Sequence, residues 1–123
     1  MATLFTSEVV STGDDAGEMF DAGIAIFFGE PCPDALAEVS VVHRGAVGPQ
    51  RDPRAGDVLR VGDAEVTVAA VGHLAGENLR SLGHLVLYMD PEEDQKLLPG
   101  AVTTVGRLPR PAAGDRIELI GTV

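Results

Sequence analysis

Three histidines are the side chains of this sequence best suited to group-transfer chemistry. The chain has no glycine-rich phosphate loop ending in Lys-Ser/Thr, no nucleophile elbow and no His-Glu-x-x-His pair. A histidine that accepts a phosphoryl group must be neutral, accessible and oriented through its second ring nitrogen. His43 ends an apolar stretch, where a strand could hold the ring within reach of a partner, while His73 lies in a predicted loop and His84 begins a predicted strand. His43 is therefore the candidate nucleophile, and a packed or hydrogen-bonded histidine without chemistry is the alternative.

Positive charge gathers directly after His43, although the chain carries a formal net charge of -10. Arg44, Arg51 and Arg54 fall in a segment that Gly45 and two prolines predict to be a loop. A guanidinium can donate two parallel hydrogen bonds to phosphate oxygens, so this group would suit a phosphoryl group held on the histidine. The alternative is that the three arginines only pair with surface carboxylates.

Charge, hydropathy and cysteine content argue against several classes of protein. Nucleic-acid binding requires Lys and Arg to displace counterions, so the acidic chain favours a basic protein partner instead. No apolar run approaches the roughly 20 residues that cross a bilayer, and the first residues lack the basic and apolar regions of a signal peptide, so we expect a cytoplasmic protein without membrane insertion. Cys32 is the only cysteine, and we expect it to be a bystander. Without further cysteines, and with histidines at wide spacing, the sequence predicts no metal and no cofactor.

Short apolar stretches broken by Gly, Pro and Asp predict a mainly β fold in a single domain, residues 1–123. The predicted strands cover 4–10, 23–28, 39–43, 58–61, 64–71, 84–89, 101–105 and 116–120. Residues 13–17 have the composition of a turn. Short helices are predicted over 33–38 and 77–82, and Gly83 is expected to end the second.

The segment 84–89 alternates, as a strand with one buried face does. The inward set is predicted to be Leu85, Leu87 and Met89, and the other set is His84, Val86 and Tyr88.

Two turns in the chain repeat the pattern Pro-x-Ala-Gly-Asp before an aliphatic strand, at Pro53 to Leu59 and at Pro111 to Ile117. Two such entries about half a chain apart fit a closed barrel whose halves have related geometry, and closure would remove exposed strand edges. The alternative is a coincidence of common turn residues.

Two strings in the second half of the chain resemble the glucitol/sorbitol-specific IIA component family of the bacterial phosphoenolpyruvate-dependent sugar phosphotransferase system. They are Val66-Thr67-Val68-Ala69-Ala70-Val71-Gly72 and Glu77-Asn78-Leu79-Arg80-Ser81-Leu82-Gly83-His84. Val41-Val42-His43 and Pro99-Gly100-Ala101-Val102 match further family positions in the same order, so the similarity spans nearly the whole chain. Some family members have a second histidine shortly after the active one, whereas here His43 is followed by Arg44 and Gly45.

The resemblance implies a small closed or partly closed β-barrel of about six main strands with one or two short helices. It also implies a phosphohistidine intermediate, HPr as phosphoryl donor and the cognate IIB component of a sugar-alcohol permease as acceptor. Carried onto this chain, the resemblance implies that His43 is the phosphohistidine. We expect Arg44 and the backbone N–H of Gly45 to stabilise the phosphoryl group and His84 to orient the ring. The alternative function is a non-catalytic β-barrel binding or regulatory module. The sugar alcohol and the oligomeric state, a homo-oligomer included, stay open.

Overall fold

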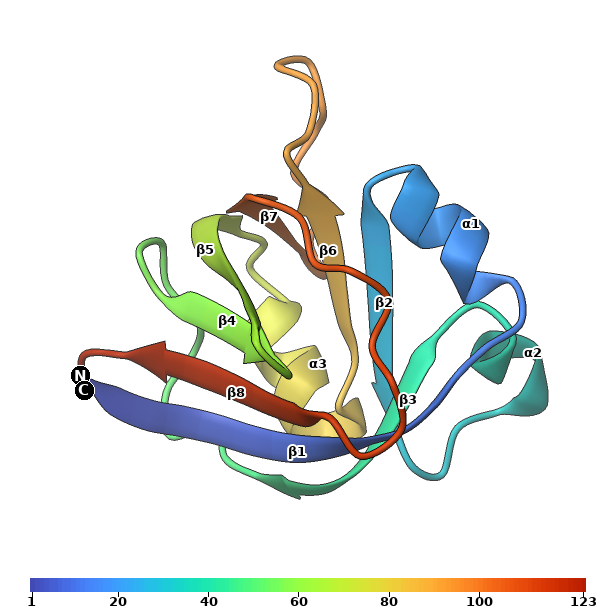
Figure 1. The fold of residues 1–123 in the computed structure, drawn as a ribbon. Helices are drawn as coiled ribbons and strands as arrows, with labels where there is room; N and C mark the ends of the chain where they lie inside the picture. Colours follow the sequence, from blue (N-terminus) through green and yellow to red (C-terminus); the bar gives the residue numbers. More distant parts are fainter.

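The computed structural model describes residues 1–123 and shows a closed mixed β-barrel (Figure 1). The strands are β1 (Ala2–Thr12), β2 (Ile24–Gly29), β3 (Val41–Val47), β4 (Val58–Val61), β5 (Ala64–Val71), β6 (Leu85–Met89), β7 (Ala101–Val105) and β8 (Arg116–Gly121). Around the barrel they follow the order β1-β3-β2-β6-β7-β5-β4-β8. The pairs β2–β3 and β6–β7 are parallel, and the other neighbouring pairs are antiparallel. The closed, mainly β prediction is confirmed, and the barrel has eight strands, as predicted from the sequence, instead of the about six main strands that the resemblance implies.

Three short helices lie in the connections: α1 (Ala16–Asp21), α2 (Asp34–Ala37) and α3 (Ala75–Leu82). α2 and α3 confirm the two predicted helices, and Gly83 ends α3 with a φ of 63°, which glycine adopts readily. α1 falls where the sequence predicts a turn, because Gly17 and Asp21 are poor helix formers. Its side chain Phe20 is buried, so packing against the barrel stabilises this helix. None of the three helices has the length and the apolar character of a membrane-spanning helix.

β3 differs from its predicted bounds, because it runs from Val41 to Val47 instead of from 39 to 43. Its register against β1 shifts twice, once on each side of His43. On one side β3 carries an extra residue at Gly45, which has a φ of 70°, and on the other side β1 carries an extra residue at Val10. His43 therefore lies inside a strand, between two local bulges.

The barrel interior is filled by aliphatic and aromatic side chains from all eight strands. In β6, Leu85, Leu87 and Met89 are buried whereas the alternate side chains are half-buried, which confirms the predicted register. Burying a side chain of this size contributes roughly 1.5–3 kcal/mol, and a slip of one residue would forfeit that contribution along the strand.

The Pro-x-Ala-Gly-Asp pattern marks two copies of one turn, before β4 and before β8. The Asp57 carboxylate accepts a hydrogen bond of 2.8 Å from the Arg54 N–H, and the Asp115 carboxylate accepts one of 2.9 Å from the Ala112 N–H. The glycines of the two turns have φ values of 95° and 92°. The repeated pattern is therefore a structural equivalence and not a coincidence.

The equivalence covers both halves of the barrel, the first half being β1–β4 and the second half β5–β8. α1 and α3, which follow β1 and β5, both begin with Ala-Gly-Glu. Val9 of β1 pairs with His43 of β3, and Val68 of β5 pairs with Thr104 of β7, with a register shift next to each pair. Thr104 thus occupies in the second half the place that His43 occupies in the first.

Candidate functional site

His43 lies at the floor of a polar cleft of about 330 Å³. The lining of this cleft comes from β2, β3 and the end of α3, and it includes Glu30, Arg44, Arg80 and Gly83. The His43 side chain is only 1% exposed, so the expectation that it faces solvent at a strand end is wrong. The reason is that β3 continues past His43 and is paired on both sides, with β1 and β2.

Both ring nitrogens of His43 have hydrogen-bond partners. Nδ1 lies 2.6 Å from Ser7 Oγ, and Nε2 lies 2.7 Å from the carbonyl oxygen of Gly83. Phe5 contacts the ring edge-on, with the centroids 6.1 Å apart. Burial lowers the pKa of His43 below its usual value, although the Gly83 carbonyl partly opposes this change. The lowered pKa favours the neutral ring at pH 7, and the two contacts hold it in one orientation, so two of the three requirements for a nucleophilic histidine are met. At 1% exposure the ring does not meet the third requirement, accessibility, unless a contact opens.

Gly83 is suited to this contact by its backbone. A side chain at position 83 would lie within 2.9 Å of His43 Cε1 and of the Gly29 backbone, and a φ of 63° also disfavours other residues. The family-like string ending in Gly83-His84 thus contains the glycine whose carbonyl oxygen contacts the His43 ring.

Arg44 and Gly45 both line the cleft, as expected from their position after His43. The Arg44 side chain is 63% exposed, and its Nε–H donates to Glu8 Oε1 at 3.2 Å. Gly45 lies in the β3 bulge, and an added Cβ would meet no atom within 4 Å, so its backbone is open to a bound group.

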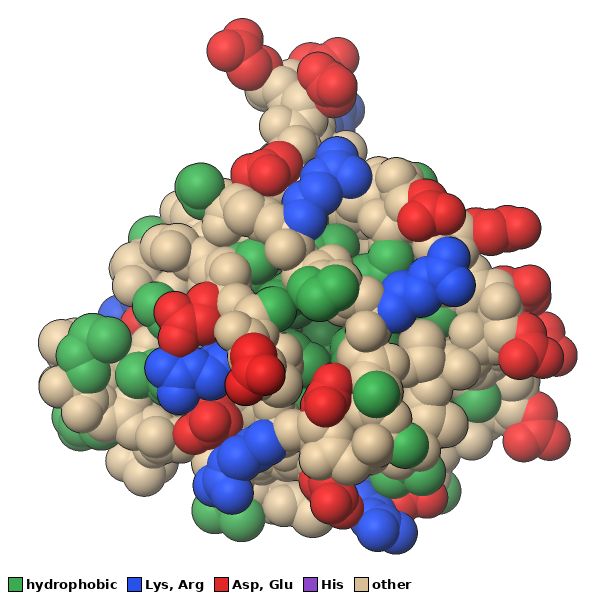
Figure 2. Space-filling model, viewed as in Figure 1, with side chains coloured by type: hydrophobic (Ala, Val, Ile, Leu, Met, Phe, Trp, Pro, Cys, Tyr) green, Lys and Arg blue, Asp and Glu red, His purple; other side chains and the backbone are tan.

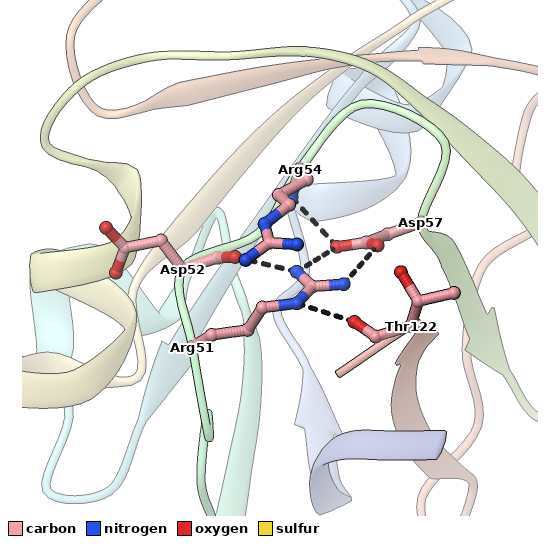
Figure 3. A network of polar contacts seen from close by, with 5 residues as sticks. All are labelled: Arg51, Asp52, Arg54, Asp57 and Thr122. Atoms are coloured by element: carbon pink, nitrogen blue, oxygen red, sulfur yellow. Dashed lines mark hydrogen bonds and ion pairs between the residues drawn. The ribbon is translucent and has the colours of Figure 1, made fainter. Parts of the chain in front are cut away.

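Arg51 and Arg54 do not join Arg44 in a phosphate-binding group, and this prediction is wrong. Arg51 donates two hydrogen bonds, of 3.0 and 2.8 Å, to the buried carboxylate of Asp57 and another of 2.8 Å to the Thr122 carbonyl oxygen (Figure 3). Burial alone would raise the pKa of Asp57, but the hydrogen bonds from Arg51 and from the Arg54 N–H lower it below its usual value. This network ties the loop before β4 to the end of the chain.

Arg80 is a second cationic residue of the cleft, and no prediction from the sequence named it as a site residue. It lies in the last turn of α3, lines the cleft together with His43, and forms an ion pair with Asp52. The pair is exposed, so it contributes little to stability and leaves the guanidinium able to exchange partners. Its position three residues before Gly83, the residue that ends the predicted helix, was the sequence feature that pointed to Arg80.

The other candidates lie away from the His43 ring. His84 Nδ1 lies 3.2 Å from the Phe27 carbonyl oxygen and its ring packs against Phe28, so the contacts that orient His43 come from Ser7 and Gly83 and not from His84. His73 is exposed in a loop. No three His, Cys, Asp or Glu side chains come together as a metal-binding group. Desolvation, together with the charge of Asp34, raises the pKa of Cys32, which keeps its thiol protonated.

These features define a class of small closed mixed barrels that hold a neutral histidine at the floor of a cleft bearing two arginines. The model of the PTS system glucitol/sorbitol-specific IIA component family matches residues 4–118, and the chain belongs to this family, which is part of the sugar phosphotransferase system.

Two relatives and one solved structure agree with this assignment. The PTS system glucitol/sorbitol-specific EIIA components of Shigella flexneri and Escherichia coli (strain K12) are each 29% identical over 114 residues, which cover 89% of this chain and 87% of each relative. The crystal structure of a PTS system IIA component from Enterococcus faecalis V583 superimposes with a TM-score of 0.77 and 28% identity, covering 94% of this chain and 99% of that one.

Proposed function

We propose that this protein is a phosphoryl carrier in which His43 takes a phosphoryl group from phospho-HPr and passes it to a IIB component for the uptake and phosphorylation of a sugar alcohol. The observation that carries the proposal is the neutral, oriented ring of His43 at the floor of an arginine-bearing cleft, in a member of the IIA family. A neutral imidazole is the form that can attack phosphorus.

Nε2 is the nitrogen that reacts. Nδ1 points to Ser7 on β1, which does not line the cleft. Nε2 points to the carbonyl oxygen of Gly83, and Gly83 lines the cleft. The Nε2 lone pair forms the new N–P bond while the N–P bond on the phosphohistidine of the donor breaks, and that nitrogen regains its lone pair. No proton or cofactor is consumed in this exchange. Because the Gly83 oxygen lies 2.7 Å from Nε2, that contact opens before transfer.

The groups around the cleft can stabilise the reaction. Phosphoryl transfer proceeds through a loose transition state whose negative charge spreads over the phosphoryl oxygens, so positioned donors matter more than covalent help. Arg44 and Arg80 line the cleft from β3 and α3, and Gly45 lines it from the β3 bulge. These are the side chains and the backbone donor that we assign to charge stabilisation.

The charge of the surface favours a basic partner. Figure 2 shows acidic side chains spread over one face and on the projecting connection between β6 and β7. With a formal net charge of -10, the protein would attract a donor with a basic phosphorylation site, and added salt would slow their encounter.

Phosphate incorporation tests the proposal. Purified protein incubated with HPr, Enzyme I and labelled phosphoenolpyruvate should take up label that is stable to alkali and labile to acid. His43→Gln should take up none, because glutamine can satisfy Ser7 and Gly83 but has no nucleophilic nitrogen. His43→Ala is less suitable, since removing a buried ring leaves a cavity and unpaired polar groups. His73→Ala is the matched control and should label like the wild type. A wild-type protein that takes up no label would favour the non-catalytic binding module.

A further inference from the structure

The Ser7 hydroxyl lies between two polar atoms that can each accept its single hydrogen. Its Oγ is 2.6 Å from His43 Nδ1 and 2.9 Å from the carbonyl oxygen of Arg44. Ser7 is 5% exposed, so water does not readily replace either partner. The β3 bulge at Gly45 lies opposite Ser7 and brings the Arg44 carbonyl oxygen within reach of its side chain.

Counting hydrogens gives two arrangements for a neutral His43. In the first, Nε2–H donates to the Gly83 carbonyl oxygen, so Nδ1 must accept and Ser7 O–H donates to it. In the second, the proton is on Nδ1 and donates to Ser7 Oγ, and the Ser7 hydrogen turns to the Arg44 carbonyl oxygen. Nε2 carries a lone pair only in the second arrangement, and a carbonyl oxygen cannot donate to it.

We propose that Ser7 is a positioning residue that holds His43 in either tautomer, because its hydroxyl donates to Nδ1 at rest and to the Arg44 carbonyl oxygen when Nε2 is free or phosphorylated. This inference rests on the proposed phosphoryl transfer at His43. Between the two arrangements, solvent accepts one proton from Nε2 and supplies one to Nδ1, so the net proton count does not change. The phosphorylated ring keeps Nδ1–H donating to Ser7, and Ser7 keeps Arg44 O as its acceptor.

The second half of the barrel carries an apolar side chain at the position equivalent to Ser7. Val66 lies in β5 where Ser7 lies in β1, and Thr104 stands where His43 does. Val66 is buried and lies next to Gly106. Gly106 has a positive φ of 95°, and Gly45, next to Ser7 in the first half, has a positive φ of 70°. A β-branched apolar side chain therefore fits this position in the barrel. We infer that the Ser7 hydroxyl is present for its contact with His43.

The experiment compares Ser7→Thr with Ser7→Val, two side chains of nearly equal shape that differ in the hydroxyl. Nitrogen NMR of the unphosphorylated proteins reports the His43 tautomer, and rapid-quench mixing with phospho-HPr reports single-turnover transfer. We expect Ser7→Thr to keep the wild-type tautomer and rate. We expect Ser7→Val to change the His43 nitrogen shifts and to slow transfer by about 10- to 100-fold, by analogy with the loss of a group that orients a metal-ligating histidine.

Unchanged nitrogen shifts and an unchanged rate in Ser7→Val would overturn the inference. A slow rate in both variants would also overturn it, because the loss would then follow from shape and not from the hydroxyl. The NMR comparison needs no phosphoryl donor, so a wild-type protein that takes up no phosphate would refute the proposed function separately. A circular dichroism melt confirms that each variant is folded before either measurement.

Discussion

The two halves of the barrel share a backbone plan but differ in chemistry. Each half has the same Gly-Asp turn, the same Ala-Gly-Glu helix start and the same shifted strand pair. In the first half the shifted strand carries His43, with Ser7 beside it; in the second it carries Thr104, whose hydroxyl donates to the Gly106 carbonyl oxygen at 3.2 Å. The shared residues specify the fold, and the residues that differ create the candidate site.

The two halves also differ in what binds the carbonyl oxygen of the glycine that follows each equivalent helix. Gly23 follows α1, and its carbonyl oxygen accepts the Met89 N–H at 2.7 Å. Gly83 follows α3, and its carbonyl oxygen faces His43 Nε2 at 2.7 Å. A backbone hydrogen bond in one half is thus replaced in the other by a contact with the candidate side chain, and the proposed transfer requires that contact to open.

The ion pairs at the two helices provide the test of this comparison with the largest expected effect on the transfer rate. Arg80 pairs with Asp52 at α3, while Arg110 pairs with Asp21 at α1, with the charges exchanged between helix and loop. Both pairs are exposed, but only Arg80 and Arg44 line the His43 cleft. Arg80→Gln and Arg44→Gln should each lower the single-turnover rate at saturating phospho-HPr on the order of 100-fold, by removing charge stabilisation from the transition state.

The matched control is Arg110→Gln, which removes an equivalent exposed pair outside the cleft and should leave the rate unchanged. Wild-type rates in Arg80→Gln would show that its guanidinium stays with Asp52, and wild-type rates in Arg44→Gln would leave that residue a solvated surface charge.

The two aspartates of the repeated turn should differ in their effect on stability. Asp57 is buried and holds both Arg51 and its own turn, whereas Asp115 is half-buried and holds only its turn. Asp57→Asn should lower the free energy of unfolding by about 2 kcal/mol, and Asp115→Asn by less than about 1 kcal/mol. Urea unfolding of both variants measures this difference. Equal losses would mean that the Arg51 network contributes nothing beyond the turn.

The smallest effect concerns pH. Because burial lowers the pKa of His43 in the folded protein, the unfolded chain binds a proton at this residue first as the pH falls below about 6.5. The free energy of unfolding should therefore decrease from there down to the folded pKa of His43 and then stop responding to this residue. His43→Gln should lack this part of the pH dependence, while His73 and His84 are common to both proteins. Identical profiles would show that His43 titrates normally.

Local patterns predicted much of the fold, and long-range contacts account for what they missed. The hairpin of β4 and β5 and the inward face of β6 follow from turn residues and alternation, so the sequence predicted them within a residue. α1 forms by packing on the barrel, and β3 continues through a bulge that β1 stabilises, so neither has a local signal.

The site was predictable in part for the same reason. His43 could be found from its place in the chain, but Ser7 is 36 residues and Gly83 40 residues away from it, and only the barrel brings them together. Arg51 lies close to His43 in the chain, but its guanidinium donates hydrogen bonds to Asp57. The clustering of charges in the sequence does not predict this pairing.

Nε2 of His43 is the atom that we propose carries the phosphoryl group. The most direct measurement is nitrogen and phosphorus NMR on the histidine-labelled protein after phosphorylation by phospho-HPr, where coupling identifies the bonded nitrogen. We predict one phosphorylated ring, that of His43, with phosphorus on Nε2 and a proton on Nδ1 held by Ser7. Phosphorus on Nδ1, on His73 or His84, or on no histidine would contradict the account.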